Sequence, residues 1–288
     1  MNKLRIIFMG TPEFAVPSLR ILAENGYDIA AVVTATDKPG RRGSELVPSD
    51  VKVAAQELGL KILQPESLKA PEFIDELNSL NANLQVVVAF RMLPEVVWSM
   101  PSLGTFNLHA SLLPQYRGAA PINWAIINGE EETGATTFFL KHEIDTGSII
   151  FQEKEPIYPT DDVEALYQRL MTKGAQLVLK TVKAIESGDY KTQPQVEAGE
   201  LKHAPKVYRA EIDWNKKTED VINFVRGMNP VPGTTTSING KTFKIFKVSK
   251  GEGPLSFKTA DGVVSIEELQ PEGKKRMKTA DFLRGHKI

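Results

Sequence analysis

Three short apolar runs constrain the fold of this chain more than any other feature. They are "LRIIFM" at residues 4–9, "IAAVVT" at 29–34 and "LQVVVAF" at 84–90, and each contains few polar side chains. Continuous apolar runs of this length are typical of strands that are buried on both faces of a parallel sheet. The sequence therefore predicts a central sheet that is covered by helices on each side.

Amphipathic stretches separate these runs. "FAVPSLRILAENG" has Pro17 in its first turn and Gly26 at its end, and Ser49 stands at the N-cap position of "SDVKVAAQELG". A further helix is predicted for "PEFIDELNSL", just before the third run. This alternation indicates an α/β fold, with a Rossmann-like, mostly parallel sheet and helices on both faces.

The pattern changes in the second half of the chain. A long helix is predicted from Asp161 to about Ser187, and the residues after it, up to 207, are polar and interrupted by prolines. Several short strand patterns with Gly and Asp-Gly turns then follow, which is typical of a small β-barrel. We expect an α/β domain at 1–189, a linker at 190–207 and a C-terminal barrel domain at 208–288.

The composition excludes some chemistry. The chain has no cysteine, so disulfides, thiolate nucleophiles and iron–sulfur clusters are excluded. No apolar run approaches the roughly 20 residues that cross a bilayer, and the chain enters a strand pattern at once, so we expect a mature start, a cytoplasmic location and no membrane partner. The net charge is +6 from Lys206 onward and −7 before it. The basic part fits a polyanionic partner, or simply a solvated lysine-rich face.

The stretch "TFNLHASLLPQYRGAAPINW", residues 105–124, carries the strongest candidate site. Asn107 and His109 are two residues apart on a predicted strand, so their side chains share one face near its carboxyl end, where ligands of α/β sheets bind. Asp145, in the turn "HEIDTG", follows a strand that can neighbour this one and can hydrogen-bond the imidazole. These side chains can also be purely structural. Together, however, an amide donor, a general base and a carboxylate suit attack on a carbonyl group.

Other motifs are missing. The chain lacks the G-x-G-x-x-G, G-x-S-x-G and G-x-x-x-x-G-K-[ST] patterns, which disfavours a nicotinamide enzyme, a serine hydrolase and a P-loop kinase. His109, His142 and Asp145 lack the tight spacing of a metal site, so we expect no metal.

The motifs resemble a known family over essentially the whole chain. "NLHASLLPQYRGAAPINWAI", "HEIDTG", "IIFMGTPEFAVPSL", "DKPGRRG" and "LQPEGKKRMKTADFLRG" are similar to those of the 10-formyltetrahydrofolate-dependent formyltransferases. The N-terminal G-T-P-x-F-A and the basic C-terminal barrel are similar to the members that act on initiator methionyl-tRNA.

The resemblance implies roles for particular residues. Asn107, His109 and Asp145 match the catalytic residues of the family, and Arg42 matches a basic loop that contacts the acceptor end of tRNA. The C-terminal domain is expected to be an OB-like barrel that binds tRNA phosphates. The formyl donor, 10-formyltetrahydrofolate, is then a substrate and initiator tRNA the partner of a monomeric enzyme. The stretch expected to contact folate consists of Ser111, Leu112, Leu113 and Pro114.

One loop departs from the family pattern. Many relatives read A-Y-G-x-x-L-P where this chain has "AFRMLP" at residues 89–94, which is one residue shorter and has Arg91 in place of glycine. Folate is still expected to bind here through backbone groups, near Phe90, Arg91 and Leu93.

Two alternatives stay open at this point. A related formyltransferase would act on a small amine such as an amino sugar and would not need residues 208–288. A non-enzymatic RNA-binding protein on the same scaffold would bind tRNA in a salt-dependent way and leave the formyl donor unchanged.

Overall fold

The computed structural model describes residues 3–40, 45–197 and 199–285. The chain divides into two compact units. Unit 1 consists of residues 1–117, 134–155 and 168–201, and unit 2 of residues 118–133, 156–167 and 202–288. The chain thus passes between the units several times. The domain boundaries expected from the sequence stay a prediction.

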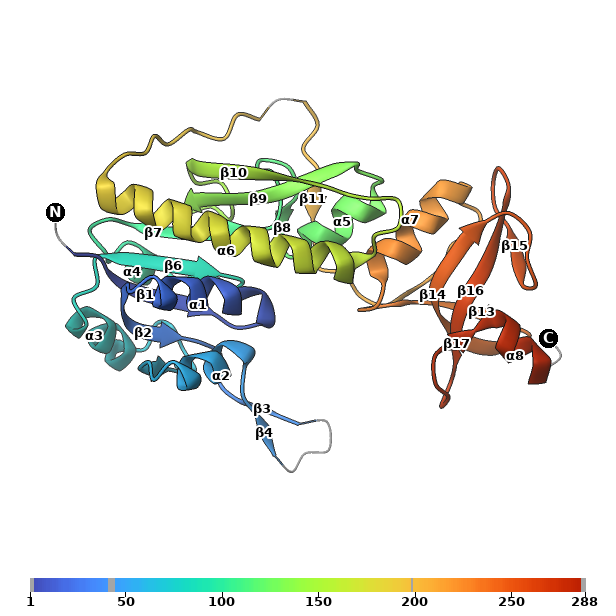
Figure 1. Ribbon diagram of the computed structural model, residues 1–288, viewed down its shortest axis with the longest axis horizontal. Helices are drawn as coiled ribbons and strands as arrows, with labels where there is room; N and C mark the ends of the chain where they lie inside the picture. Colours follow the sequence, from blue (N-terminus) through green and yellow to red (C-terminus); the bar gives the residue numbers. More distant parts are fainter. Residues whose placement is uncertain (1–2, 41–44, 198, 286–288) are drawn as a thin grey trace. The chain divides into compact units, whose positions relative to one another are not determined.

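A seven-stranded, mostly parallel sheet contains the three apolar runs (Figure 1). β1 pairs in parallel with β2 and β6, β6 pairs in parallel with β7, and β7 pairs antiparallel with β9. The predicted α/β fold is therefore confirmed. In spatial order the strands are β10 (Ile149–Pro156), β9 (Glu132–Phe139), β7 (Thr105–His109), β6 (Leu84–Val88), β1 (Arg5–Gly10), β2 (Asp28–Val33) and β5 (Ile62–Leu63).

Helices cover both faces of this sheet. α3 (Pro71–Ser79) and α4 (Glu95–Trp98) bury apolar side chains against one face, in a cluster with residues of β1 and β2. α1 (Val16–Glu24), preceded by the short helix η1 (Glu13–Ala15), and α6 (Val163–Ser187) cover the other face (Figure 1). α2 (Asp50–Glu57) begins after Ser49, whose hydroxyl accepts from Lys52 N at 3.1 Å, as the N-cap prediction requires.

Unit 2 contains a second, six-stranded sheet with its own apolar core. Helix α7 (Thr218–Met228) packs on β14, and its buried side chains join those of the strands in one cluster. α5 (Pro121–Ile127) packs against α7 in the same unit, and Asn123 Nδ2 donates to the Gly227 carbonyl at 2.8 Å. The other elements of unit 2 are β12 (Ala210–Glu211), β13 (Thr234–Ile238), β14 (Lys241–Lys250), β15 (Ser256–Lys258), β16 (Val263–Pro271), β17 (Met277–Lys278) and α8 (Thr279–Gly285).

The remaining strands are four more that have two residues each. These are β3 (Lys38–Pro39), β4 (Leu46–Val47), β8 (Arg117–Gly118) and β11 (His203–Ala204). Among the described residues, no helix combines the length and apolar character that a membrane crossing requires.

Candidate active site

The packing of α6 decides which way the side chains of β7 point. A Cβ added at Gly174 of α6 would lie 2.7 Å from Cδ2 of Leu108, so helix and strand meet closely at this glycine. Leu108 therefore faces α6. Because side chains alternate along a strand, Asn107 and His109 lie together on the opposite face.

His109 is oriented by a backbone carbonyl. Its ring is buried, and Nε2 lies 2.8 Å from the carbonyl oxygen of Tyr116. A carbonyl oxygen only accepts hydrogen bonds, so Nε2 carries a hydrogen and donates it. Nδ1 faces Asp145, at 3.8 Å from Oδ2. This distance is an ion-pair contact and exceeds a direct hydrogen bond. The ring is thus fixed mainly through Tyr116, whereas the sequence pointed to Asp145.

The turn that carries Asp145 depends on a glycine. Asp145 has a left-handed backbone with φ of 56°. A Cβ added at Gly147 would lie 1.5 Å from the carbonyl oxygen of Phe139, at the end of β9. Only glycine allows this approach, which brings the turn against the strand that pairs with β7. The structure therefore brings Asp145 and His109 together across two neighbouring strands.

Asn107 completes the group of three. Its side chain is half-buried beside His109 on β7. Within the part of the chain that the structure describes, the Asn107 amide has no hydrogen-bond partner. A half-buried amide of this kind has donors available for a ligand.

Hydrogen bonds to two neighbouring strands hold the S-L-L-P stretch. The hydroxyl of Thr136 on β9 donates to the Ser111 carbonyl at 2.6 Å and accepts from Leu113 N at 3.2 Å. Gln152 on β10 donates to the Leu113 carbonyl at 2.9 Å. The Ser111 side chain is itself buried and donates to the Gln115 carbonyl at 2.6 Å. Leu113 is also buried, whereas Leu112 and Pro114 remain half-buried.

The side chains of the 89–94 loop differ in how far they are free to contact a ligand. Leu93 is buried in the cluster under α3 and α4, and Phe90 packs partly against the same cluster. The Arg91 guanidinium donates to the carbonyls of Glu66, at 2.9 Å, and Pro65. Arg91 therefore ties this loop to the segment after β5. Arg42, the residue expected to contact tRNA, lies outside the described residues.

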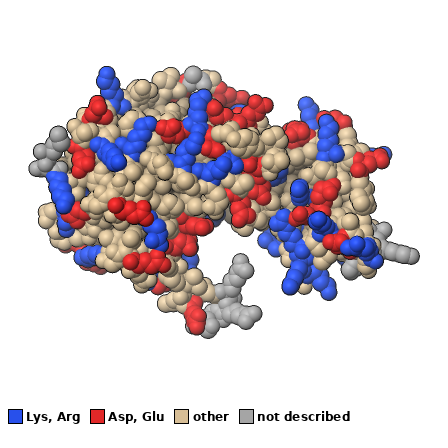
Figure 2. Space-filling model, in the orientation of Figure 1, with Lys and Arg blue, Asp and Glu red and all other residues tan. Residues whose placement is uncertain are grey.

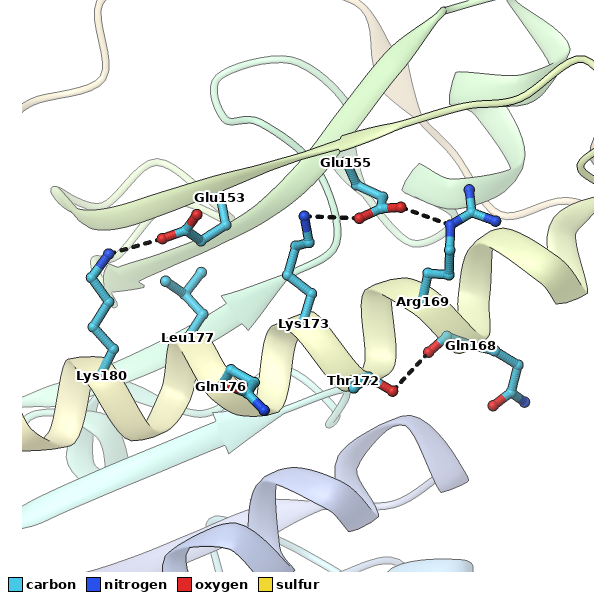
Figure 3. A pocket seen from close by; sticks show the side chains of 9 residues that line it. All are labelled: Glu153, Glu155, Gln168, Arg169, Thr172, Lys173, Gln176, Leu177 and Lys180. Atoms are coloured by element: carbon cyan, nitrogen blue, oxygen red, sulfur yellow. Dashed lines mark hydrogen bonds and ion pairs between the residues drawn. The ribbon is translucent and has the colours of Figure 1, made fainter.

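A separate hollow of about 820 Å³ lies between β10 and α6 (Figure 3). Its charged groups pair with one another: Glu155 with Arg169 and Lys173, and Glu153 with Lys180. Asn107, His109 and Asp145 do not line it. We place the candidate site at the three converging side chains, where an imidazole and a carboxylate meet an amide that has no hydrogen-bond partner among the described residues. Among the described residues, no group of three or more His, Asp or Glu side chains is arranged to hold a metal ion.

Three contributors to this site could not be found from the sequence. The Tyr116 carbonyl is a backbone group, which leaves no trace in residue type. Thr136 and Gln152 act from strands whose register only the fold defines.

Family models match nearly the whole chain. The model described as formyl transferase matches residues 3–182, and that described as formyl transferase, C-terminal domain, matches residues 206–287.

Curated proteins are similar over the full length. A methionyl-tRNA formyltransferase of Parabacteroides distasonis is 51% identical, over 99% of this chain and 96% of its own. One of Phocaeicola vulgatus is 52% identical over the same shares.

Solved structures share the fold at lower identity. WlaRD, a sugar 3N-formyl transferase, has a TM-score of 0.69 at 22% identity, over 96% of this chain and 100% of that one. HypX from Aquifex aeolicus in complex with tetrahydrofolic acid has a TM-score of 0.65 at 21% identity, over 98% of this chain and 47% of that one.

Proposed function

Because the chain belongs to the formyl transferase family, we propose that Asn107, His109 and Asp145 are its catalytic residues. The protein transfers the formyl group of 10-formyltetrahydrofolate to the free amino group of methionine on initiator methionyl-tRNA. The product is the N-formylmethionyl-tRNA with which translation begins. The observation that carries this function is the 51% identity over 99% of the chain to a methionyl-tRNA formyltransferase.

Asn107 stabilises the charge that develops during transfer. The methionine nitrogen attacks the formyl carbon, and negative charge builds up on the formyl oxygen. The bond between that carbon and the folate nitrogen then breaks. A preorganised donor at the oxygen lowers the barrier because it binds the transition state more strongly than the ground state. The Asn107 amide supports this role because it is half-buried and makes no hydrogen bond with any described residue.

His109 manages the proton that the amine loses. Its Nε2 hydrogen is engaged with the Tyr116 carbonyl, so Nδ1 is the nitrogen left to accept a proton. The carboxylate of Asp145, 3.8 Å from Nδ1, stabilises the charged ring. The proton is finally delivered to the folate nitrogen, which leaves as a neutral amine.

The acceptor tRNA is bound mainly through its phosphates. In Figure 2, Lys and Arg side chains gather on the visible side of the C-terminal part of the chain. Contacts from such side chains to phosphates give strong, salt-dependent binding with little base specificity. We assign the same kind of contact to Arg42.

A transfer assay with three acceptors tests this function. Labelled formyl donor is mixed with the protein and charged initiator tRNA, charged elongator tRNA or a nucleotide-linked amino sugar. We expect label on the initiator tRNA and little on the other two. Label on the sugar alone would favour the alternative, a formyltransferase that acts on amino sugars. This chain is only 22% identical to the solved sugar enzyme WlaRD. Salt-dependent tRNA binding without transfer would favour the RNA-binding alternative.

We also infer that the enzyme works as a monomer in the cytoplasm. Sedimentation of the purified chain, alone and with charged tRNA, tests the first part. A sedimenting mass of two chains would contradict it.

A further inference from the structure

Gln195 joins the two halves of the active site although it lies within the segment predicted as a linker. Its side-chain Nε2 donates to the carbonyl of Asp145 at 2.8 Å and to the carbonyl of Gly147 at 2.9 Å. Both hydrogens of the amide are thus directed at the turn that carries the Asp145 carboxylate.

The other end of the same amide holds Arg117. The Oε1 of Gln195 accepts from Arg117 Nε at 3.1 Å and from Nη2 at 2.7 Å. Arg117 Nη1 also pairs with Glu197 at 2.7 Å. Since a guanidinium only donates and a carbonyl only accepts, the amide of Gln195 has a single possible orientation. All four of its hydrogen-bonding positions are used.

Arg117 directly follows Tyr116, whose carbonyl orients His109. One side chain therefore connects the loop that holds the imidazole with the turn that holds the carboxylate. The Gln195 segment is itself anchored two residues earlier, where Gln193 and Ile149 of β10 exchange backbone hydrogen bonds at 2.8 and 2.9 Å.

The Asp145 turn needs such support. A non-glycine residue in the left-handed region is strained by about 1–2 kcal/mol relative to the right-handed one. Aspartate tolerates this region better than most residues, and the cost that remains at Asp145, with φ of 56°, is offset by its surroundings. The hydrogen bond from Gln195 to its carbonyl is a direct restraint of that kind.

We propose that Gln195 is a positioning residue, which keeps the Asp145 carboxylate facing Nδ1 of His109. This inference rests on the proposed function and deepens it. Gln195 acts through the turn that carries Asp145. A misplacement of about 1 Å at a catalytic group can cost on the order of 100-fold in rate.

The first test compares Gln195→Ala with Gln193→Ala, a matched change of an exposed glutamine on the same segment. We expect the kcat of Gln195→Ala to fall 10- to 100-fold. Its KM for formyl donor and for charged initiator tRNA should stay within about twofold, because binding groups are intact. Gln193→Ala should behave like the wild type. Equal kcat values for the two variants, with an active wild-type enzyme, would overturn the proposal; an inactive wild type would instead contradict the proposed function.

A second test separates positioning from a general loss of structure. Gln195→Ala is combined with Asp145→Asn. If Gln195 acts through Asp145, it should add little to the loss caused by Asp145→Asn alone. Multiplied losses would overturn the proposal.

Gln195→Glu covers the case in which the alanine variant folds poorly. The carboxylate keeps the bond to Arg117 but cannot donate to the Asp145 and Gly147 carbonyls. Its kcat should therefore fall as in Gln195→Ala. Wild-type kcat in this variant would show that the two donated hydrogen bonds are not needed.

Discussion

At the scale of single residues, the site combines an amide with no hydrogen-bond partner among the described residues and an imidazole that has one. The Nε2 hydrogen of His109 is engaged with Tyr116, whereas the Asn107 amide stays available on the same face of β7. The two residues therefore have different tasks, and their substitutions should have separable effects.

Asn107→Ala should slow formyl transfer by about 100- to 1,000-fold, the usual cost of losing one oxyanion donor. The fold should be kept because the amide makes no hydrogen bond within the described part of the chain. Single-turnover rates and the melting temperature check both statements. Asn78→Ala, at an exposed position of α3, is the control. Near-normal turnover of the Asn107 variant would refute its assignment.

Gly147→Ala should damage both stability and activity. The new Cβ would meet the Phe139 carbonyl at 1.5 Å, so the turn has to move and takes Asp145 with it. We expect a loss of about 3 kcal/mol or more in the free energy of unfolding, together with a large fall in kcat. Gly188→Ala is the control: it has φ of 74° but nothing within 4 Å, so it carries only the backbone cost of about 1–2 kcal/mol. Urea denaturation distinguishes the two.

The residue types of this site were readable from the sequence, but part of its geometry was not. The spacing of Asn107 and His109 on a strand predicts their common face. The contacts of the Tyr116 carbonyl and the Gln195 amide form only in the folded chain. No sequence motif or hydrophobic periodicity predicts them. Polar, proline-containing segments such as 190–207 suggest a linker because their side chains have no apolar face to bury.

At the scale of elements, one buried carboxylate ties β10 to α6. Glu155 accepts from Arg169 at 2.7 Å and pairs with Lys173 at 2.8 Å, while its side chain is only 8% exposed (Figure 3). Burial alone raises the pKa of Glu155, but the hydrogen bonds and charges of Lys173 and Arg169 outweigh it and leave this pKa lowered.

Because folding lowers the pKa of Glu155, the direction in which stability changes with pH is defined. The stabilisation by Glu155 is present above its ordinary pKa of 4.5 and is lost as the pH falls through the folded value. Glu155→Gln should cost about 2 kcal/mol of unfolding free energy at neutral pH, because the two bases left behind are partly solvated, and less in acid. Urea denaturation at both pH values tests this. Glu153→Gln, in an exposed pair with Lys180, should cost about 1 kcal/mol or less. Equal effects of the two variants would contradict the argument.

The predictable elements were those with a continuous apolar run or a cap residue. The apolar runs became β1, β2 and β6, and the Ser49 cap formed as expected. α4 and the two-residue strands are too short to show a period. α5 was also missed, although Pro121 begins it and its buried residues Ile122, Ala125 and Ile126 have helical spacing, because seven residues are too few to show a clear period.

At the scale of the whole molecule, the charge difference between the two ends of the chain predicts a salt effect on one substrate only. A protein that neutralises about four phosphates loses on the order of 100-fold in affinity over a fourfold rise in salt. The KM for charged initiator tRNA should therefore rise steeply with salt, while the KM for the formyl donor changes little. Steady-state kinetics at several salt concentrations check this. A flat tRNA profile would argue against phosphate contacts.

The six stretches that alternate between the units limit how the protein can be dissected. A cut at residue 207 would leave α5 behind without α7, although the two helices pack together and Gly227 lies against Ile127. The shortened polypeptide would expose a hydrophobic patch on α5 and tend to aggregate. Recombination that exchanged only one end of the gene would meet the same obstacle, so we expect the two units to be exchanged only together.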